Sequence, residues 1–198
     1  MELTESQVSR IRRAFRALNK NMLLMWRLGL GRMMATRHGG YVMVLATTGR
    51  KSGRRRLAPL NFAEEGTSLY CLAGFGKRTH WLLNLEAEPR CEVWLPDGRW
   101  VEGHGKVVSE QTLRLEMVRK ILVRAGFAAK VAEPGLDPIT APEDVISELG
   151  QSYGQRYEVV QIDLGNPVSG PGGPGDLAWV WPVSAGALLA LWLLLRRR

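Results

Sequence analysis

The residues best suited to chemistry lie in one short basic segment, Thr47 to Arg56. Five cations occupy the seven positions from Arg50 to Arg56, and no acidic residue lies among them. Gly49 and Gly53 can adopt a positive φ at little cost, so neighbouring backbone N–H groups can turn toward one point. Such a loop suits a ligand that carries a phosphate and further negative charge.

Two plainer interpretations of this segment stay open. A run of cations is often a solvated face, and it can also be a surface that binds nucleic acid. A Walker-type nucleotide loop is excluded, because the Gly-x-x-x-x-Gly-Lys-Ser/Thr spacing is absent and the flanks are typical of two strands. The pattern therefore favours an anion site over these alternatives without excluding them.

Composition bounds the class of protein. The chain has 198 residues, enough for one domain with a core, and its net charge of +8 favours phosphorylated cofactors, nucleic acid or anionic lipid as partners. Cys71 and Cys91 lie in apolar stretches without Cys-x-x-Cys spacing, which indicates small buried side chains. The three histidines are scattered along the chain, so we expect no metal site.

The elements around the basic segment would hold it in place. Residues 41–48 lead into it and residues 57–64 lead out, so we expect two strands joined by a loop. The first is apolar on both faces, which indicates a buried strand of a closed or covered sheet. Residues 68–74 would pair with the second strand across a turn at Glu65-Gly66.

A glycine-rich turn over residues 73–76 and a short helix come next. Thr79 is placed to be the N-cap of this helix. Trp81, Asn84 and Leu85 share one of its faces by their spacing. The pattern therefore places an aromatic ring and an amide side by side.

The remaining stretches would complete a small α+β barrel. We expect a hairpin, two helices and a final strand at residues 91–108, 109–125, 142–149 and 156–164. The Gly/Pro-rich residues 165–175 would be a flexible linker.

Both ends of the chain carry apolar helical patterns. Residues 5–36 have an apolar stripe with basic flanks, so this helix would either pack on the domain or lie on a membrane surface. Residues 177–195 contain no charge and precede three arginines. At about 1.5 Å per residue this run approaches the roughly 30 Å of a bilayer core. We expect a transmembrane anchor, with a buried core helix as the alternative.

Two motifs resemble the hallmarks of a known family. Residues 47–60 match the pattern TTGRKSGxxRxxPL, and residues 81–89 match WxxNLxxxP. Both patterns are typical of the deazaflavin (coenzyme F420)-dependent nitroreductase family. The resemblance covers roughly residues 40–165.

This resemblance implies a split β-barrel, related in shape to FMN-binding pyridoxamine-phosphate oxidases. Members of the family use the reduced deazaflavin coenzyme to reduce quinones, nitro compounds and enones. Carried over motif by motif, the implied cofactor-binding residues are Arg50, Lys51, Ser52, Arg56, Leu57, Ala58, Pro59, Leu60, Asn61, Ala73, Gly74, Phe75, Gly76, His80, Trp81 and Asn84. No catalytic residue is implied, because the second turn lacks the serine of some members and Tyr153 and Tyr157 have no clear counterpart.

The negative charge of the coenzyme complements the positive charge of the basic segment. Its tail carries a phosphodiester and γ-linked glutamates, which Arg50, Lys51 and Arg56 would bind by charge-assisted hydrogen bonds. Trp81 and Asn84 would line the ring pocket, one by packing and one by hydrogen bonding. The coenzyme would supply the hydride chemistry, and the protein would supply orientation and a dry site.

The first hypothesis is thus an F420H2-dependent oxidoreductase acting on a quinone, nitro or enone acceptor. The second is an FMN-binding split-barrel oxidoreductase, although FMN has one phosphate and no acidic tail. The third is a non-catalytic, membrane-tethered coenzyme-binding protein, or a basic module for nucleic acid. We expect no nucleic acid, because no aromatic residue is interleaved with the basic segment.

These expectations divide the chain into four parts. They are an N-terminal amphipathic helix (1–38), a split β-barrel deazaflavin-binding domain (39–165), a Gly/Pro linker (166–176) and a C-terminal membrane anchor (177–198). Expected partners are the coenzyme, a small-molecule or quinone acceptor, membrane lipid and a second copy in a homodimer. The protein would be membrane-associated, with its enzymatic domain on the cytoplasmic side.

Overall fold

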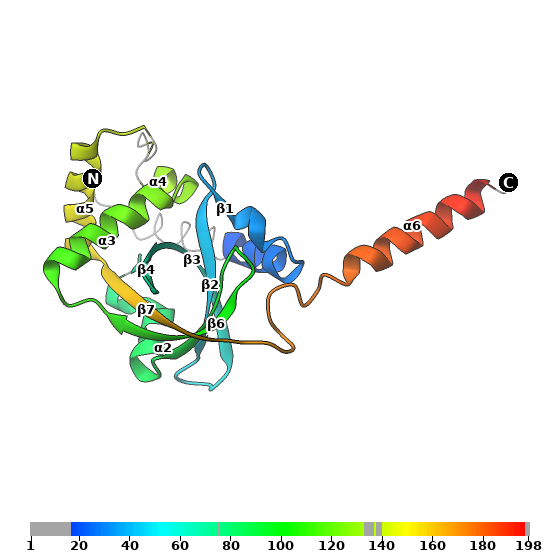
Figure 1. Ribbon diagram of the computed structural model, residues 1–198, viewed down its shortest axis with the longest axis horizontal. Coiled ribbons are helices and arrows are strands. Elements are labelled where there is room, and N and C mark those ends of the chain that lie inside the picture. Colours follow the sequence, from blue (N-terminus) through cyan, green and yellow to red (C-terminus); the bar gives the residue numbers. More distant parts are fainter. Residues whose placement is uncertain (1–16, 75, 133–136, 138–139, 197–198) are drawn as a thin grey trace.

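The strands of this protein close into a barrel. The computed structural model describes residues 17–74, 76–132, 137 and 140–196. Its strands are β1 (Ala35–Thr36), β2 (Gly40–Thr48), β3 (Arg55–Glu65), β4 (Ser68–Ala73), β5 (Arg90–Trp94), β6 (Trp100–Val107) and β7 (Glu158–Pro167). They pair antiparallel in the order β1-β2-β3-β4-β7-β6-β5, and a further pairing of β2 with β5 closes β2 to β7 into a ring (Figure 1). The predicted α+β split β-barrel is confirmed.

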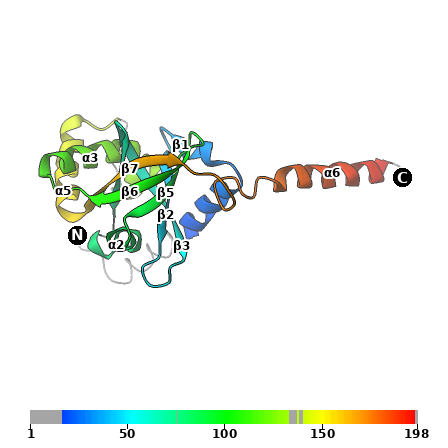
Figure 2. The ribbon, with the colours of Figure 1, turned by 60° about the horizontal axis from the view of Figure 1, so that its bottom comes forward.

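Helices cover the barrel and extend from it. The described helices are a helix over residues 17–27, η1 (Gly31–Met34), η2 (Gly76–Arg78), α2 (His80–Ala87), α3 (Gln111–Arg124), α4 (Phe127–Ala132), α5 (Glu143–Arg156) and α6 (Val180–Arg196). Two views show α3 and α5 on one side of the barrel, whereas α6 projects from the opposite side (Figures 1 and 2).

Strand β2 is buried on both faces, as its apolar run predicts. Met43 and Leu45 belong to the core inside the barrel. Val44, between them, packs outside the barrel against Trp26 and Trp94. The two tryptophan rings lie 6.4 Å apart between centroids, and this contact attaches the helix over residues 17–27 to the barrel.

The cysteines are buried side chains of the barrel. Cys71 and Cys91 are free thiols, and both are buried. Burial raises the pKa of the Cys71 thiol, and it raises the pKa of Cys91 to about 12. Both thiols are therefore protonated at neutral pH, which confirms the prediction of small buried side chains.

The predicted N-terminal helix over residues 5–36 ends earlier than expected. Gly29 has a φ of 81°, and Leu30 N donates to Met25 O at 2.9 Å, which is the αL termination that glycine favours. The chain then forms η1 and β1. The stripe positions before residue 17 lie outside the described residues.

Two helices differ from the sequence pattern as well. The predicted helix over residues 142–149 continues to Arg156 as α5, although Gly150 and Gly154 disfavour helix. A Cβ on Gly154 would meet Leu115 at 2.8 Å, so this glycine lets α5 approach α3 closely. Helix α4 was not predicted, because it is only six residues long. In α5, packing against α3 outweighs the low helix propensity of the two glycines.

The Gly/Pro-rich segment is held on the barrel rather than free. Val168 N donates to Trp100 O at 2.7 Å, and a Cβ on Gly173 would lie 2.3 Å from the Trp100 ring. Asp176 accepts three hydrogen bonds from Arg27, at 3.0, 3.2 and 2.9 Å. We call residues 168–176 the strap. Composition alone predicts a flexible linker here and does not reveal these contacts.

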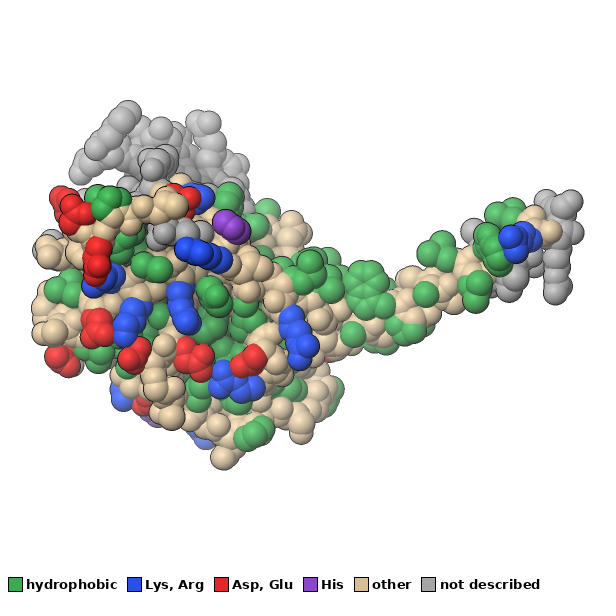
Figure 3. Space-filling model, turned by 45° about the horizontal axis from the view of Figure 1, so that its top comes forward, with side chains coloured by type: hydrophobic (Ala, Val, Ile, Leu, Met, Phe, Trp, Pro, Cys, Tyr) green, Lys and Arg blue, Asp and Glu red, His purple; other side chains and the backbone are tan. Residues whose placement is uncertain are grey.

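The predicted transmembrane anchor over residues 177–195 is not supported. Residues 177–179 form a turn, so α6 has 17 residues and a length of about 25 Å. Within the described part of the chain, no helix has the length and apolar character that a membrane span needs. The alternative of a buried core helix does not fit either, because Leu188 is 68% exposed and hydrophobic side chains lie along the projecting arm (Figure 3).

Gly40, at the start of β2, lies against the turn between α3 and α4, and this contact gives a stability prediction. Gly40 has a φ of 93°, and a Cβ there would lie 2.4 Å from Ala125 O. Gly40→Ala should cost about 2–5 kcal/mol, from left-handed backbone and overpacking together. Gly66→Ala is the matched control, because Gly66 has a φ of 59° and open space around it. It should cost only about 1–2 kcal/mol.

Denaturant unfolding of the two variants and the parent measures both losses. Equal losses for the two variants would show that the contact at Ala125 contributes nothing.

Candidate active site

A pocket of about 920 Å³ lies between the barrel and its covering helices. The helix over residues 17–27 forms one wall, β3 and the start of α2 form a second, and α3 and α4 form a third. Most of its lining side chains are apolar, including Met22, Leu60, Leu122 and Phe127. A flat, largely apolar ligand fits such a space.

Seven of the predicted cofactor-binding residues line this pocket. They are Ala58, Pro59, Leu60, Asn61, Gly74, His80 and Trp81. Their side chains come from β3, from the turn after β4 and from the first turn of α2. The structure therefore brings together residues from both sequence motifs.

The basic segment forms a tight loop between β2 and β3. Ser52 N and Gly53 N both donate to Gly49 O, at 3.0 and 2.8 Å, and Gly53 has a φ of 61°. Gly49 has no positive φ, but a Cβ there would lie 3.0 Å from Arg54 O. Glycine is thus needed at 53 for backbone conformation and at 49 for space.

One cation of the basic segment, Arg55, makes contacts that stabilise the fold. Arg55 pairs with Glu92 and donates to Gly172 O in the strap. Its guanidinium also lies over the Trp94 and Trp100 rings, 5.4 and 5.6 Å from their centroids. Arg55 thereby connects the start of β3 to the strap.

The other four loop cations are exposed: Arg50, Lys51, Arg54 and Arg56. Within the described residues, none of the four has an acidic partner. Arg56 donates instead to the Ser52 hydroxyl at 3.3 Å. The loop therefore presents four positive charges without acidic partners in the described part of the chain, and the Ser52 hydroxyl lies in the same loop.

Asn84 contacts the loop rather than the pocket. Its side chain is buried, and its Oδ1 accepts from both the backbone N and the guanidinium of Arg50, each at 3.2 Å. Its Nδ2 donates to Thr47 Oγ1 at 3.1 Å. Asn84 was expected in the ring pocket, but here its amide oxygen binds Arg50 and its amide nitrogen binds Thr47.

The remaining predicted residues lie at other places. Leu57 packs outside the barrel with Trp26 and Trp94, and Ala73 is fully buried in the barrel core. Gly76, with a φ of 58°, begins η2. Phe75 lies outside the described residues.

Helix α2 connects the pocket to the loop. His80 and Trp81 in its first turn line the pocket, and Asn84 in its next turn binds Arg50. Three residues of helix correspond to about 5 Å. One helix thus contacts an apolar pocket at its first turn and the cationic loop at its next turn.

Several pocket residues were not predicted. They come from the covering helices and from the turn before α2: Leu18, Asn19, Met22, Arg78, Thr79, Ile121, Leu122, Phe127 and Tyr153 are examples. Met22 belongs to the predicted apolar stripe, and Thr79 was predicted as an N-cap. Their approach to β3 depends on tertiary packing, for which the sequence gives no local signal.

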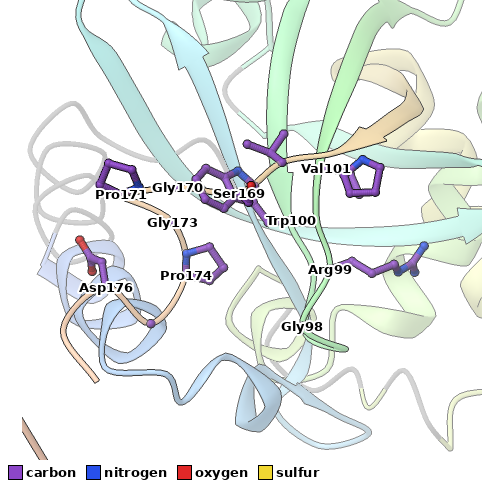
Figure 4. Close-up of a pocket in the computed structure, with 14 residues that line it drawn as sticks. Gly98, Arg99, Trp100, Val101, Ser169, Gly170, Pro171, Gly173, Pro174 and Asp176 are labelled. Atoms are coloured by element: carbon purple, nitrogen blue, oxygen red, sulfur yellow. The ribbon is translucent and has the colours of Figure 1, made fainter. Parts of the chain in front are cut away.

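A second hollow, of about 910 Å³, lies between the strap and the β5–β6 turn. Figure 4 shows the strap passing this turn, with the Arg99 side chain directed away from it. Arg99 pairs with Asp97 and Glu64, and Asp176 pairs with Arg27. Because its charged lining residues are already paired, this hollow offers a ligand little to bind.

Comparison with known proteins identifies the family. A family model described as F420H(2)-dependent quinone reductase matches residues 22–130. This chain belongs to that family. The matched residues contain the loop, α2 and most of the pocket walls of this F420H(2)-dependent quinone reductase family member. Membership in an F420-dependent oxidoreductase family, which the two motifs predict, is confirmed.

Solved structures with similar shapes are distant from this family member. A protein titled F420 Reductase is 18% identical, covering 68% of this chain and 94% of its own, with a TM-score of 0.40. A conserved hypothetical protein from Mycobacterium tuberculosis is 16% identical, covering 66% and 76%, with a TM-score of 0.49. A FAD-binding protein from Mesorhizobium loti is 19% identical, covering 67% and 89%, with a TM-score of 0.41. At these values no function is transferred from any of them.

Proposed function

We propose that this protein transfers a hydride from reduced coenzyme F420 to a quinone. The ring of the coenzyme would lie in the pocket, and its acidic tail would lie on the loop. The observation that carries this proposal is that α2 contacts both regions within one turn, with Trp81 at the pocket and Asn84 at the loop. A ligand with one flat end and one anionic end matches that arrangement.

Each part of the site would have a separate task. Arg50, Lys51 and Arg56 bind phosphate and glutamate oxygens, and Asn84 fixes the backbone that presents them. Trp81 and the β3 residues orient the ring, while the apolar walls exclude water. When bound, the reduced coenzyme supplies the hydride, and the quinone also takes up a proton to leave as hydroquinone.

The choice of acceptor and coenzyme follows from the same residues. An apolar pocket suits a quinone ring, and nitro compounds and enones are the further acceptors that we propose to test. FMN is the weaker alternative, because its single phosphate would leave most of the four exposed loop cations without a partner.

Steady-state turnover tests the proposal. The reduced coenzyme is mixed with the protein and a quinone, a nitroaromatic or an enone, and its oxidation is followed by absorbance. We expect the quinone to have the highest kcat/KM. Tight coenzyme binding without reduction of any acceptor would favour the non-catalytic binding protein instead.

Two further partners stay predictions. Membrane lipid would meet the exposed apolar side chains of α6, among them Trp181, Leu188 and Leu189. Flotation with lipid vesicles, compared with a chain that ends before Val180, tests that contact. A homodimer is tested by the mass of the protein in solution.

A further inference from the structure

Helix α2 begins at the pocket with an N-cap residue that does not cap it. Thr79 occupies the N-cap position, but its side chain makes no capping hydrogen bond. The residue is 6% exposed and lines the pocket. Among the described residues, its hydroxyl has no hydrogen-bond partner. A buried hydroxyl without a partner is unfavourable, so this one points to a group that arrives from outside the chain.

The surroundings of Thr79 are rich in donors. The first N–H groups of α2, at His80 and Trp81, have no partner within the helix, and they carry the positive end of its dipole. The first turn of α2 holds no acidic residue. Arg78 lines the same pocket. A ligand oxygen with partial negative charge is therefore the group that this end of the pocket would accept.

The rest of the pocket limits what carries that oxygen. Met22, Leu60 and Leu122 provide apolar walls, and the Asn61 amide already donates to Tyr41 O at 3.2 Å. A neutral hydroxyl among apolar walls suits a carbonyl oxygen on a flat ring better than a phosphate, because burying a phosphate against those walls would cost the hydration of its charge.

We propose that the Thr79 hydroxyl, together with the N–H groups that begin α2, receives a ring carbonyl oxygen of the ligand. This assignment rests on the proposed function, which supplies two such rings: the dione ring of the deazaflavin and the quinone. The hydroxyl can reach the ligand by rotation about its Cα–Cβ bond, and a bound carbonyl would satisfy it.

The test uses Thr79→Val, which keeps the shape but removes the donor, and Thr79→Ser, which keeps the donor. In the absence of ligand, Thr79→Val should melt higher than the parent, by about 2–4 °C, because an unsatisfied hydroxyl is gone. Thr79→Ser has no such gain. A clear drop in the melting temperature of Thr79→Val would mean that the hydroxyl already has a partner, and would overturn the assignment.

Two binding measurements separate the two rings. Titration with the oxidised coenzyme alone should show affinity about 3- to 10-fold weaker for Thr79→Val if the deazaflavin carbonyl binds here. If the quinone carbonyl binds here, that affinity is unchanged and kcat/KM for the quinone falls by the same factor at saturating coenzyme. Thr79→Ser should restore either loss.

The assignment and the proposed function fail in different ways. If Thr79→Val matches the parent within twofold in both measurements, the assignment is overturned while the proposed function stands. If the parent binds no coenzyme, the proposed function is overturned and the assignment falls with it.

Discussion

Replacing Arg50 with alanine should weaken coenzyme binding ten- to hundredfold, with little change in turnover at saturating coenzyme. Its guanidinium is already held by Asn84 Oδ1, so a charge-assisted contact to the tail costs little further ordering. The lost contact is the same in the ground and transition states, so KM for the coenzyme rises while kcat holds.

Two other loop variants sharpen this expectation. Lys51 is exposed, so Lys51→Ala should weaken binding only about two- to fivefold, as for solvated ion pairs. Asn84→Ala should resemble Arg50→Ala rather than a ring-pocket variant, because Asn84 fixes Arg50 and Thr47. Arg55→Ala is a control for charge alone. It should lower the free energy of unfolding, because the contacts with Glu92 and with Gly172 of the strap are lost. The affinity for the coenzyme should change little.

The measurement is coenzyme affinity and steady-state turnover for the four variants, each at low and high salt. The losses should shrink as salt screens the contacts. Unchanged affinity in both Arg50→Ala and Asn84→Ala would leave the loop as a solvated face.

Replacing Trp81 should reduce turnover itself, on the order of a hundredfold for Trp81→Ala at saturating coenzyme. The indole lines the pocket and also belongs to the barrel core, so its loss leaves space in which the ring can shift. Small displacements between donor and acceptor are costly in hydride transfer.

Trp81→Ala also risks folding, because truncating a buried tryptophan costs about 3–5 kcal/mol. Trp81→Phe preserves much of the packing and should give a smaller fall in kcat with a native melting curve. Turnover of both variants within twofold of the parent would show that Trp81 supports the barrel without orienting the ring.

The sequence predicted the parts of the fold that depend on local pattern. The apolar run of β2, the positive φ of Gly53 and the turn at Gly66 all agree with their residue types, whereas the positive φ expected at Gly49 is not found. The family resemblance that the two motifs carry also selected seven residues that line one pocket. Local patterns sufficed because strands, tight turns and a short helix each depend on neighbouring residues.

Long-range contacts decided the rest. Asn84 shares a helix face with Trp81, but its amide binds a loop 34 residues earlier. Arg55 and Arg56 are adjacent exposed cations, yet Arg55 pairs with Glu92 whereas Arg56 has no acidic partner among the described residues. The strap is held by Trp100 and Arg27, and α6 begins only at Val180, which shortens the predicted span. Neither spacing nor composition records such partners.

The most direct test of the central claim is a parallel titration of the full chain with oxidised coenzyme F420 and with FMN, at low and high salt. Binding of the deazaflavin should be tighter than binding of FMN at low salt, and the difference should narrow as ionic strength rises, because the acidic tail meets exposed loop cations. Equal affinity for the two cofactors, or a deazaflavin preference that salt does not change, would contradict the placement of the tail on the loop.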